Sequence, residues 1–205
     1  MIETVADIYY ARTRKRHLYN ITSIDNIPSI MEHGIICYDQ ARSLQHSSIA
    51  MNDVQARRAL KRIPNGLRLH QYANLYFTYH NPMMYKRKDI AETICVLVLS
   101  ATVLDIEDCI VSDMNAAADL AMFYPAHEGI GKLDFDSIFA KYWTHENPYE
   151  QRKHKAIKCA EILVPSKIPV DYIEGGAVVN PTAEQALVNT GFDRRVIVYP
   201  PAFFR

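Results

Sequence analysis

One carboxylate, Glu161, stands where its neighbours would strongly affect its chemistry. It follows a cation-rich run with helical character, residues 151–160 (QRKHKAIKCA), and it precedes a short apolar run closed by a proline, residues 162–165 (ILVP). Burial at the mouth of a strand raises the pKa of a carboxyl group and nearby cations lower it, as is common for catalytic carboxylates. The alternative is structural: an ion pair at a helix end with Lys155 or Lys158.

Two further segments carry groups that could bind a phosphate or an amide. Residues 19–22 (YNIT) and the pair Asp25-Asn26 would lie at a strand end and a helix start, where free backbone N–H groups receive anions. An ordinary helix cap from Asp25 or Asn26 is the alternative. Arg57-Arg58 lies in a predicted helix, where one guanidinium could clamp a diphosphate with two hydrogen bonds, or the pair could simply face solvent.

A third segment, residues 74–85 (NLYFTYHNPMMY), interleaves aromatic side chains with methionines and polar groups. Aromatic rings of this kind can stack on a nucleobase or on nicotinamide. Such stripes also serve as core, so the pattern alone leaves both interpretations open.

Several familiar catalytic signatures are absent from the sequence. It has no G-x-S-x-G or H-E-x-x-H motif, and no G-x-G-x-x-G or P-loop, so a dinucleotide would not be held in the Rossmann manner. Asp134 and Asp136 would not face each other on a helix. The four cysteines share no zinc-finger spacing, which favours buried thiols over a metal site or a disulfide framework.

The composition is that of an ordinary globular protein. With 205 residues, 49% hydrophobic and 22% charged, the chain can bury a sizeable core, and we expect a single domain over residues 1–205. No repeat and no apolar stretch long enough to span a bilayer occurs. The N-terminus has no apolar segment typical of an export signal. We therefore expect a monomeric cytoplasmic protein that does not bind membranes.

Charge is balanced overall, with 23 basic and 23 acidic residues, but it is unevenly spread. Basic clusters occur within residues 12–16, 57–62, 86–88 and 152–158, while acids concentrate over residues 105–119. A neutral total therefore leaves room for an anionic ligand, because the local field matters more than the sum.

The patterning predicts that strands and helices mix without regular alternation, which favours an α+β fold. A helix should begin near Pro28 and end at Gly34. We expect the chain before the first strand to form a basic arm. We expect strands at residues 17–22, 72–79, 93–99, 161–164, 176–179 and 196–199, helices at residues 54–62, 116–123 and 135–142, and a loop at residues 39–52.

Taken in order, these segments resemble the DarT family of DNA ADP-ribosyltransferase toxins, the toxic halves of DarT–DarG toxin–antitoxin pairs. They span most of the chain in the family's order, so the combination is far more specific than any one motif. The pieces that carry the resemblance are LYNITSIDNIPSIMEHGI (18–35), SIAMNDVQARR (48–58), LHQYANLYFTYHNPMMY (69–85), SDMNAAA (112–118) and CAEILVP (159–165).

The resemblance implies a mono-ADP-ribosyltransferase fold, with a split, mostly antiparallel β core, flanking helices and an NAD cleft. NAD would be the co-substrate, no metal would be needed, and ADP-ribose would pass to thymine or guanine in single-stranded DNA. Glu161 and Arg58 fall on the family's catalytic positions. The aligned NAD-binding positions are Asn20, Ile21, Thr22, Asn26, Ser29, Cys37, Arg58 and Tyr76, and the aligned substrate-binding positions are Tyr76, Met83 and Asn115.

In the implied mechanism, the Glu161 carboxylate stabilises positive charge that develops on the ribose and orients its 2′-hydroxyl. Arg58 would hold the NAD phosphates and polarise the DNA base. A guanidinium resists acting as a proton acceptor, so proton removal would fall to Glu161 or to water.

One departure from the family pattern bears on the base that is modified. Many members read His-Ile-Thr where this chain reads Asn20-Ile21-Thr22, and an asparagine has a different reach and does not titrate. Thymine and guanine therefore both stay open. The implied partners are single-stranded DNA and a DarG-like macrodomain antitoxin. The alternatives are transfer to RNA or protein, or a nucleic-acid-binding relative without catalysis, against which the presence of both Arg58 and Glu161 argues.

Overall fold

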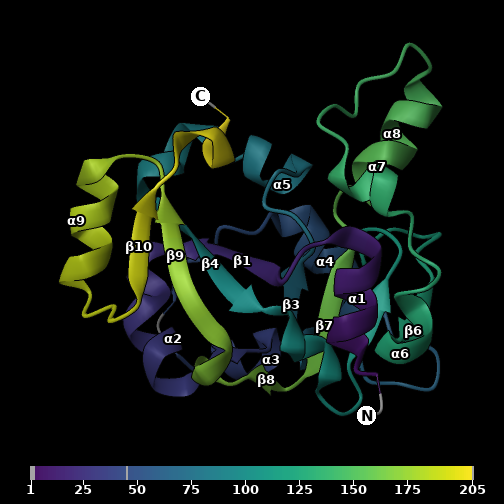
Figure 1. Ribbon diagram of the computed structural model, residues 1–205, viewed down its shortest axis with the longest axis horizontal. Helices are drawn as coiled ribbons and strands as arrows, with labels where there is room; N and C mark the ends of the chain where they lie inside the picture. Colours follow the sequence, from purple (N-terminus) through teal and green to yellow (C-terminus); the bar gives the residue numbers. More distant parts are fainter. Residues whose placement is uncertain (1–2, 45, 205) are drawn as a thin grey trace.

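A computed structural model describes residues 3–44 and 46–204, and its centre is a mostly antiparallel sheet (Figure 1). Neighbouring strands of this sheet are antiparallel, except that β9 (Ile173–Val178) and β10 (Arg195–Val198) are parallel. A separate antiparallel pair joins β2 (Ile35–Ile36) to β8 (Lys167–Ile168). The order of the main sheet is β10, β9, β4 (Ile94–Ser100), β1 (His17–Ser23), β3 (Tyr72–Tyr76), β7 (Glu161–Pro165), β5 (Ile110–Ser112) and β6 (Phe123–Pro125).

Helices flank the sheet, which gives the α+β architecture that the patterning predicted. Within the described residues, no helix is both long and apolar enough to cross a membrane. The helices are α1 (Val5–Thr13), α2 (Ile27–His33), α3 (Tyr38–Ala41), α4 (Asn52–Leu60), α5 (Pro82–Tyr85), α6 (Ala126–Gly129), α7 (Phe135–Phe139), α8 (Pro148–Ile157) and α9 (Pro181–Asn189). Figure 1 shows α9 beside β9 and β10 at one end of the molecule, and α6, α7 and α8 at the other.

Three of these helices begin at the same local signal, an asparagine followed by a proline. The side chains of Asn81, Asn147 and Asn180 each accept a backbone N–H from the first turn of α5, α8 and α9. Proline suits the first helical position because its missing N–H would have no helical partner there and its φ angle is already helical. The sequence therefore fixes where these helices start.

The core is densest where the sequence is most continuously apolar. The first four residues of β4 and of β7 are all buried, so both faces of the central sheet are covered there. A cluster of three rings, Tyr9, Phe77 and Phe135, joins α1, the chain after β3 and α7. This packing joins both helices to the chain that follows β3.

The six predicted strands are all present, with shifted ends. The one predicted at residues 72–79 ends at Tyr76, because the chain turns there towards α5. The helix that ends at Gly34 and the one predicted at residues 54–62 are confirmed as α2 and α4. Strands β2, β5, β6 and β8 are too short to show a pattern and were not predicted.

Other predictions were wrong. The basic arm contains α1, whose start is a capping box between Thr4 and Asp7, and α9 was missed. The predicted loop at residues 39–52 contains most of α3 and the first residue of α4. The predicted helix at residues 135–142 ends at Phe139.

The predicted helix at residues 116–123 does not form, although its alanines favour one. The backbone N–H groups of Ala116 and Ala117 bond to the side chains of Glu161 and Asn115 instead of to carbonyls one turn earlier. One long-range contact, to Glu161, and one local contact, to Asn115, therefore override the helix propensity, and β6 begins at Phe123.

Candidate active site

A cavity of about 570 Å³ opens where β1 and β3 meet α2, α4, α5, α8 and the segment of residues 46–51. This volume is in the range of ordinary ligand sites. None of the described lining residues is Asp or Glu, so cations dominate the cavity although the chain is neutral overall. Such a cavity concentrates positive potential and favours a polyanionic ligand. The six lining cations are Arg57, Arg58, Lys86, Arg87, Arg152 and Lys155.

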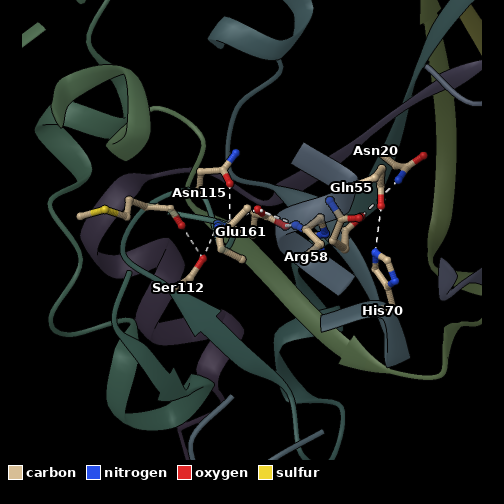
Figure 2. A network of polar contacts seen from close by, with 11 residues as sticks. Asn20, Gln55, Arg58, His70, Ser112, Asn115 and Glu161 are labelled. Atoms are coloured by element: carbon tan, nitrogen blue, oxygen red, sulfur yellow. Dashed lines mark hydrogen bonds and ion pairs between the residues drawn. The ribbon is translucent and has the colours of Figure 1, made fainter. Parts of the chain in front are cut away.

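A buried ion pair, Arg58 with Glu161, lies at the wall of this cavity (Figure 2). The Nη1 of Arg58 donates to both carboxylate oxygens of Glu161, at 3.1 Å to Oε1 and 2.8 Å to Oε2. Glu161 has no exposed surface and Arg58 is 7% exposed. The backbone N–H of Ala116 also donates to Oε1, at 2.9 Å. The carboxylate is therefore held from two sides, by a side chain of α4 and by the turn after β5.

Electrostatics keep Arg58 charged. Burial by itself lowers the pKa of Arg58, but the charge of Glu161 and the hydrogen bond to it outweigh burial, and the net pKa is raised. Tyr76 lies opposite Glu161 in the pairing of β3 with β7. Burial and then the charge of Glu161 raise the pKa of Tyr76, so its phenol stays protonated. A guanidinium with a raised pKa cannot serve as a base.

The sheet and one helix bring the two residues of the pair together. Glu161 is the first residue of β7 and continues a stretch that is buried from Lys158 onward. Arg58 lies in the last turn of α4. The two are 103 residues apart in the sequence, so their contact is a product of the tertiary fold.

The cavity gathers most of the binding residues that the sequence predicted. The side chain of Asn20 donates to the backbone oxygen of Asn74 at 3.2 Å, which ties β1 to β3 at the cavity wall. The predicted residues that line the cavity are Asn20, Ile21, Thr22, Asn26, Ser29, Arg58, Tyr76, Met83 and Asn115.

Asn26 occupies the N-cap position of α2, but its side chain makes no capping hydrogen bond there. Its Nδ2 donates to Thr22 Oγ1 at 3.1 Å and to the Ser47 carbonyl at 2.9 Å, and its Oδ1 accepts from the Ser47 N–H at 2.8 Å. Further along the same segment, the Nε of Arg87 donates to the Ile49 carbonyl at 2.6 Å. These contacts hold residues 46–51 across the cavity, all of which line it.

Two predicted site residues lie elsewhere. Cys37 is 3% exposed and does not line the cavity, although its neighbours Ile36 and Tyr38 do. Its backbone N–H bonds to the Ser166 carbonyl next to the β2–β8 pair, and its thiol is buried. Glu161 also does not line the cavity, since Arg58 lies between it and the opening.

The structural alternative for Glu161, a pair with a nearby lysine, is wrong. Lys158 is buried, and its Nζ donates to the backbone oxygens of Ile138 and Ala140, both at 2.8 Å. Burial lowers the pKa of Lys158 to about 8. Lys158 therefore anchors the chain after α7 and is not available to contact DNA, whereas Lys155 lines the cavity.

Sequence reasoning missed a second polar group at the cavity, built on Gln55. Gln55 and Tyr38 line the cavity, the His70 ring nitrogen Nε2 lies 3.0 Å from Gln55 Oε1, and the His70 ring packs 4.1 Å from that of Tyr38. Burial, and then the charge of Arg58, lower the pKa of His70, so its ring is neutral near pH 7. The sequence did contain a signal for Gln55: it precedes Arg58 by three residues in the predicted helix, so the two side chains lie on the same helix face.

The four cysteines are free and buried, as predicted. Burial raises the pKa of Cys159, which lines the cavity, to about 12, so this thiol is a poor nucleophile. No group of three or more His, Cys, Asp or Glu side chains that could hold a metal ion occurs within residues 3–44 and 46–204.

Comparison with known proteins identifies relatives of this chain. It is 30% identical over 202 residues to a DNA ADP-ribosyl transferase–DNA ADP-ribosyl glycohydrolase fusion protein of Thermosipho africanus, covering 93% of this chain and 50% of the fusion. The chain thus spans about half the length of that relative. It is 32% identical over 173 residues to a DNA ADP-ribosyl transferase of Thermus sp., covering 78% of this chain and 80% of the relative.

Solved structures of DarT from Thermus sp. 2.9 match this fold over nearly the whole of both chains. The fold matches Thermus sp. 2.9 DarT in complex with ADP-ribosylated ssDNA with a TM-score of 0.80 and 27% identity, over 93% of this chain and 97% of that one. The NAD+ complex of the same protein matches with a TM-score of 0.73 and 26% identity, over 92% and 97% of the two chains.

The fold is thus that of the known DarT structure, and it holds a cationic cavity with a buried arginine–glutamate pair at its wall. The family model described as "ssDNA thymidine ADP-ribosyltransferase, DarT" matches residues 19–204. The chain belongs to the DarT family. The family resemblance and the fold class inferred from sequence are both confirmed.

Proposed function

We propose that this chain transfers ADP-ribose from NAD to a base of single-stranded DNA and releases nicotinamide. The observation that carries the proposal is the buried Arg58–Glu161 pair at the wall of a cavity with six cations and no carboxylate among its described lining residues. The family description names thymidine, and we propose thymine as the base.

The residues of the cavity fit NAD. A diphosphate needs cations, and a dinucleotide needs amides and hydroxyls for its sugars and bases, which Asn20, Thr22 and Ser29 supply at the cavity wall. When bound, NAD supplies an activated ribose: the bond from C1′ to the nicotinamide nitrogen breaks, its electron pair leaves with nicotinamide, and a base nitrogen bonds C1′ and loses its proton.

Each member of the pair has a separate role in this proposal. Glu161 places a fixed negative charge where positive charge develops, in a dry site where such an interaction is strong. Arg58 holds the Glu161 carboxylate through Nη1, and the rest of its guanidinium can donate to a phosphate or a base carbonyl in the cavity. Because Arg58 cannot accept a proton, the proton of the base goes to Glu161 or to water.

A single strand suits this cavity as the acceptor. A base can enter a pocket only after it leaves its stack, which costs least in single-stranded DNA. Asn115 and Met83 line the cavity beside the pair, and Arg152 and Lys155 line it from α8, where they could contact the phosphate backbone.

We further propose that the protein acts as the toxin of a toxin–antitoxin pair. The Thermosipho africanus relative joins a DNA ADP-ribosyl transferase to a DNA ADP-ribosyl glycohydrolase in one chain, so the function that reverses the modification accompanies the function that makes it. A separate DarG-like macrodomain protein would supply that function here. We propose a single catalytic domain that acts as a monomer in the cytoplasm.

The direct test supplies NAD labelled in its adenosine half together with single-stranded DNA, RNA or protein. The expected result is label on DNA alone, and mass spectrometry of the released nucleosides should find ADP-ribosylated thymidine. Label on RNA or protein alone would overturn the proposed acceptor, and modified deoxyguanosine would overturn the proposed base. Binding of DNA without any label would indicate a binding module.

Removal of the Lys155 charge should weaken DNA binding without changing the chemistry. We expect Lys155→Gln to raise the KM for a single-stranded oligonucleotide and to make the slope of log affinity against log salt shallower by about 0.7, the value of one phosphate contact. Lys153→Gln is the matched control, because Lys153 lies on the same helix, is exposed and does not line the cavity. An unchanged salt slope in Lys155→Gln would contradict a phosphate contact.

A further inference from the structure

The turn that follows β5 wraps around the Glu161 carboxylate, and Ser112 begins it (Figure 2). Ser112 has no exposed surface. Its Oγ lies 2.7 Å from the Met114 carbonyl and 3.2 Å from the backbone nitrogen of Glu161. A carbonyl can only accept and a backbone N–H can only donate, so the Ser112 hydroxyl donates to the Met114 carbonyl and accepts from the Glu161 N–H. One hydroxyl thus ties the turn to the first residue of β7.

The turn held in this way supplies a donor to the carboxylate. Asn115, which follows Met114 in the turn, donates its backbone N–H to the Ala156 carbonyl at 2.8 Å. This bond fixes the turn against α8. Ala116 then donates its backbone N–H to Glu161 Oε1 at 2.9 Å. Without the Ser112 hydroxyl, the backbone at Met114 and at Glu161 would lose the bond that sets the distance between the turn and the strand.

The two carboxylate oxygens consequently differ. Oε1 accepts from both Arg58 and Ala116, whereas Oε2 accepts from Arg58 alone among the described residues. A carboxylate offers about four lone-pair positions, so Oε2 retains more acceptor capacity than Oε1. Oε2 therefore has acceptor capacity left for a further donor, such as a sugar hydroxyl, which would reach it only after a shift of the Arg58 side chain that separates Glu161 from the cavity.

We propose that Ser112 is a positioning residue of the transferase reaction: through the turn of residues 112–116 it anchors Glu161 by Oε1 and leaves Oε2 for the substrate. The inference rests on the proposed function. Ser112 touches no substrate in this arrangement, and it acts through the orientation of the carboxylate. A shift of about 1 Å in a catalytic group can cost about 100-fold in rate.

The test compares Ser112→Ala, Ser112→Cys and Ser112→Thr in the DNA-labelling assay, with NAD and oligonucleotide varied separately. We expect Ser112→Ala to lower kcat by roughly 10- to 100-fold with little change in the KM for NAD. Ser112→Thr, which keeps the hydroxyl, should restore activity relative to Ser112→Ala, and Ser112→Cys, a weaker donor of similar size, should lie between them. If Ser112→Ala does not fold, the comparison of Ser112→Cys with Ser112→Thr carries the test.

Ser100→Ala is the matched control. Like Ser112, Ser100 is the last residue of a strand. Its Oγ accepts the backbone N–H of Thr102, two residues later. Ser100 does not line the cavity. Its kcat should equal that of the unmodified protein. A folded Ser112→Ala protein with unchanged kcat, or one whose defect lies wholly in KM, would overturn the positioning role.

Failure of the proposed function gives a different pattern. If the unmodified protein labels no DNA, the proposed acceptor is wrong, and release of nicotinamide from NAD in water becomes the readout for Ser112, because Glu161 serves that bond cleavage whatever the acceptor. The same 10- to 100-fold loss in Ser112→Ala is then expected, and an unchanged rate of release would overturn the positioning role on its own.

Discussion

Glu161→Gln is expected to lower the rate of DNA labelling by about 1000-fold or more, the largest effect of any single substitution in this chain. Glutamine keeps the shape of the side chain and can still accept the N–H of Ala116, so the change removes the negative charge and little else. A single preorganised electrostatic group is worth about 100- to 1000-fold in comparable sites, and here the group carries a full charge in a site with no exposed surface. Labelled NAD and an oligonucleotide under single-turnover conditions measure the rate.

The same substitution should also lower stability, which the sequence did not indicate. It leaves the charge of Arg58 without a partner at a position that is 7% exposed, and breaking a buried pair in this way costs about 3–5 kcal/mol. Thermal unfolding with and without Glu161→Gln measures this cost. Loss of activity must therefore be separated from loss of folded protein.

A second substitution makes that separation. In the double variant Glu161→Gln with Arg58→Met the site is neutral, so we expect much of the lost stability to return while activity stays absent. Glu184→Gln on α9 controls for the loss of one carboxylate far from the cavity. If a folded Glu161→Gln protein labels DNA at more than about a tenth of the normal rate, Glu161 does not carry the electrostatic role assigned to it.

Arg58→Lys should give the second-largest loss, about 100-fold in kcat, with most of the stability retained. One lysine ammonium can replace Nη1 as the partner of Glu161. It cannot pair with Glu161 and at the same time present donors to a ligand in the cavity, which the fork of a guanidinium does. Thermal unfolding and steady-state kinetics on one preparation give both quantities.

Arg62→Lys provides the matched control for this loss. Arg62 lies four residues after Arg58, is exposed, bonds to the Gly66 carbonyl and does not line the cavity. We expect it to behave as the unmodified protein. Full activity in Arg58→Lys would mean that charge alone is needed at this position, and a collapse in stability equal to that of Glu161→Gln would mean that lysine cannot reach the carboxylate.

The sequence by itself determined the parts of this protein that depend on neighbours a few residues apart. Continuous apolar runs identified β4 and β7, because a strand buried on both faces has no polar side to alternate with. Gly34 identified the end of α2. Motifs kept in the family's order pointed to Arg58 and Glu161, and most of the binding residues that they predicted line one cavity.

The tertiary structure alone decided how those residues meet. The local pattern offered Lys155 or Lys158 as a possible partner for Glu161 and predicted a helix at residues 116–123. In the fold, Lys158 bonds to two carbonyls, Arg58 reaches Glu161 across 103 residues, and Ala116 gives its N–H to that carboxylate. Local propensities amount to about 1 kcal/mol or less per residue, whereas an unpaired buried charge costs several. The buried carboxylate of Glu161 therefore determines the conformation of the chain around it.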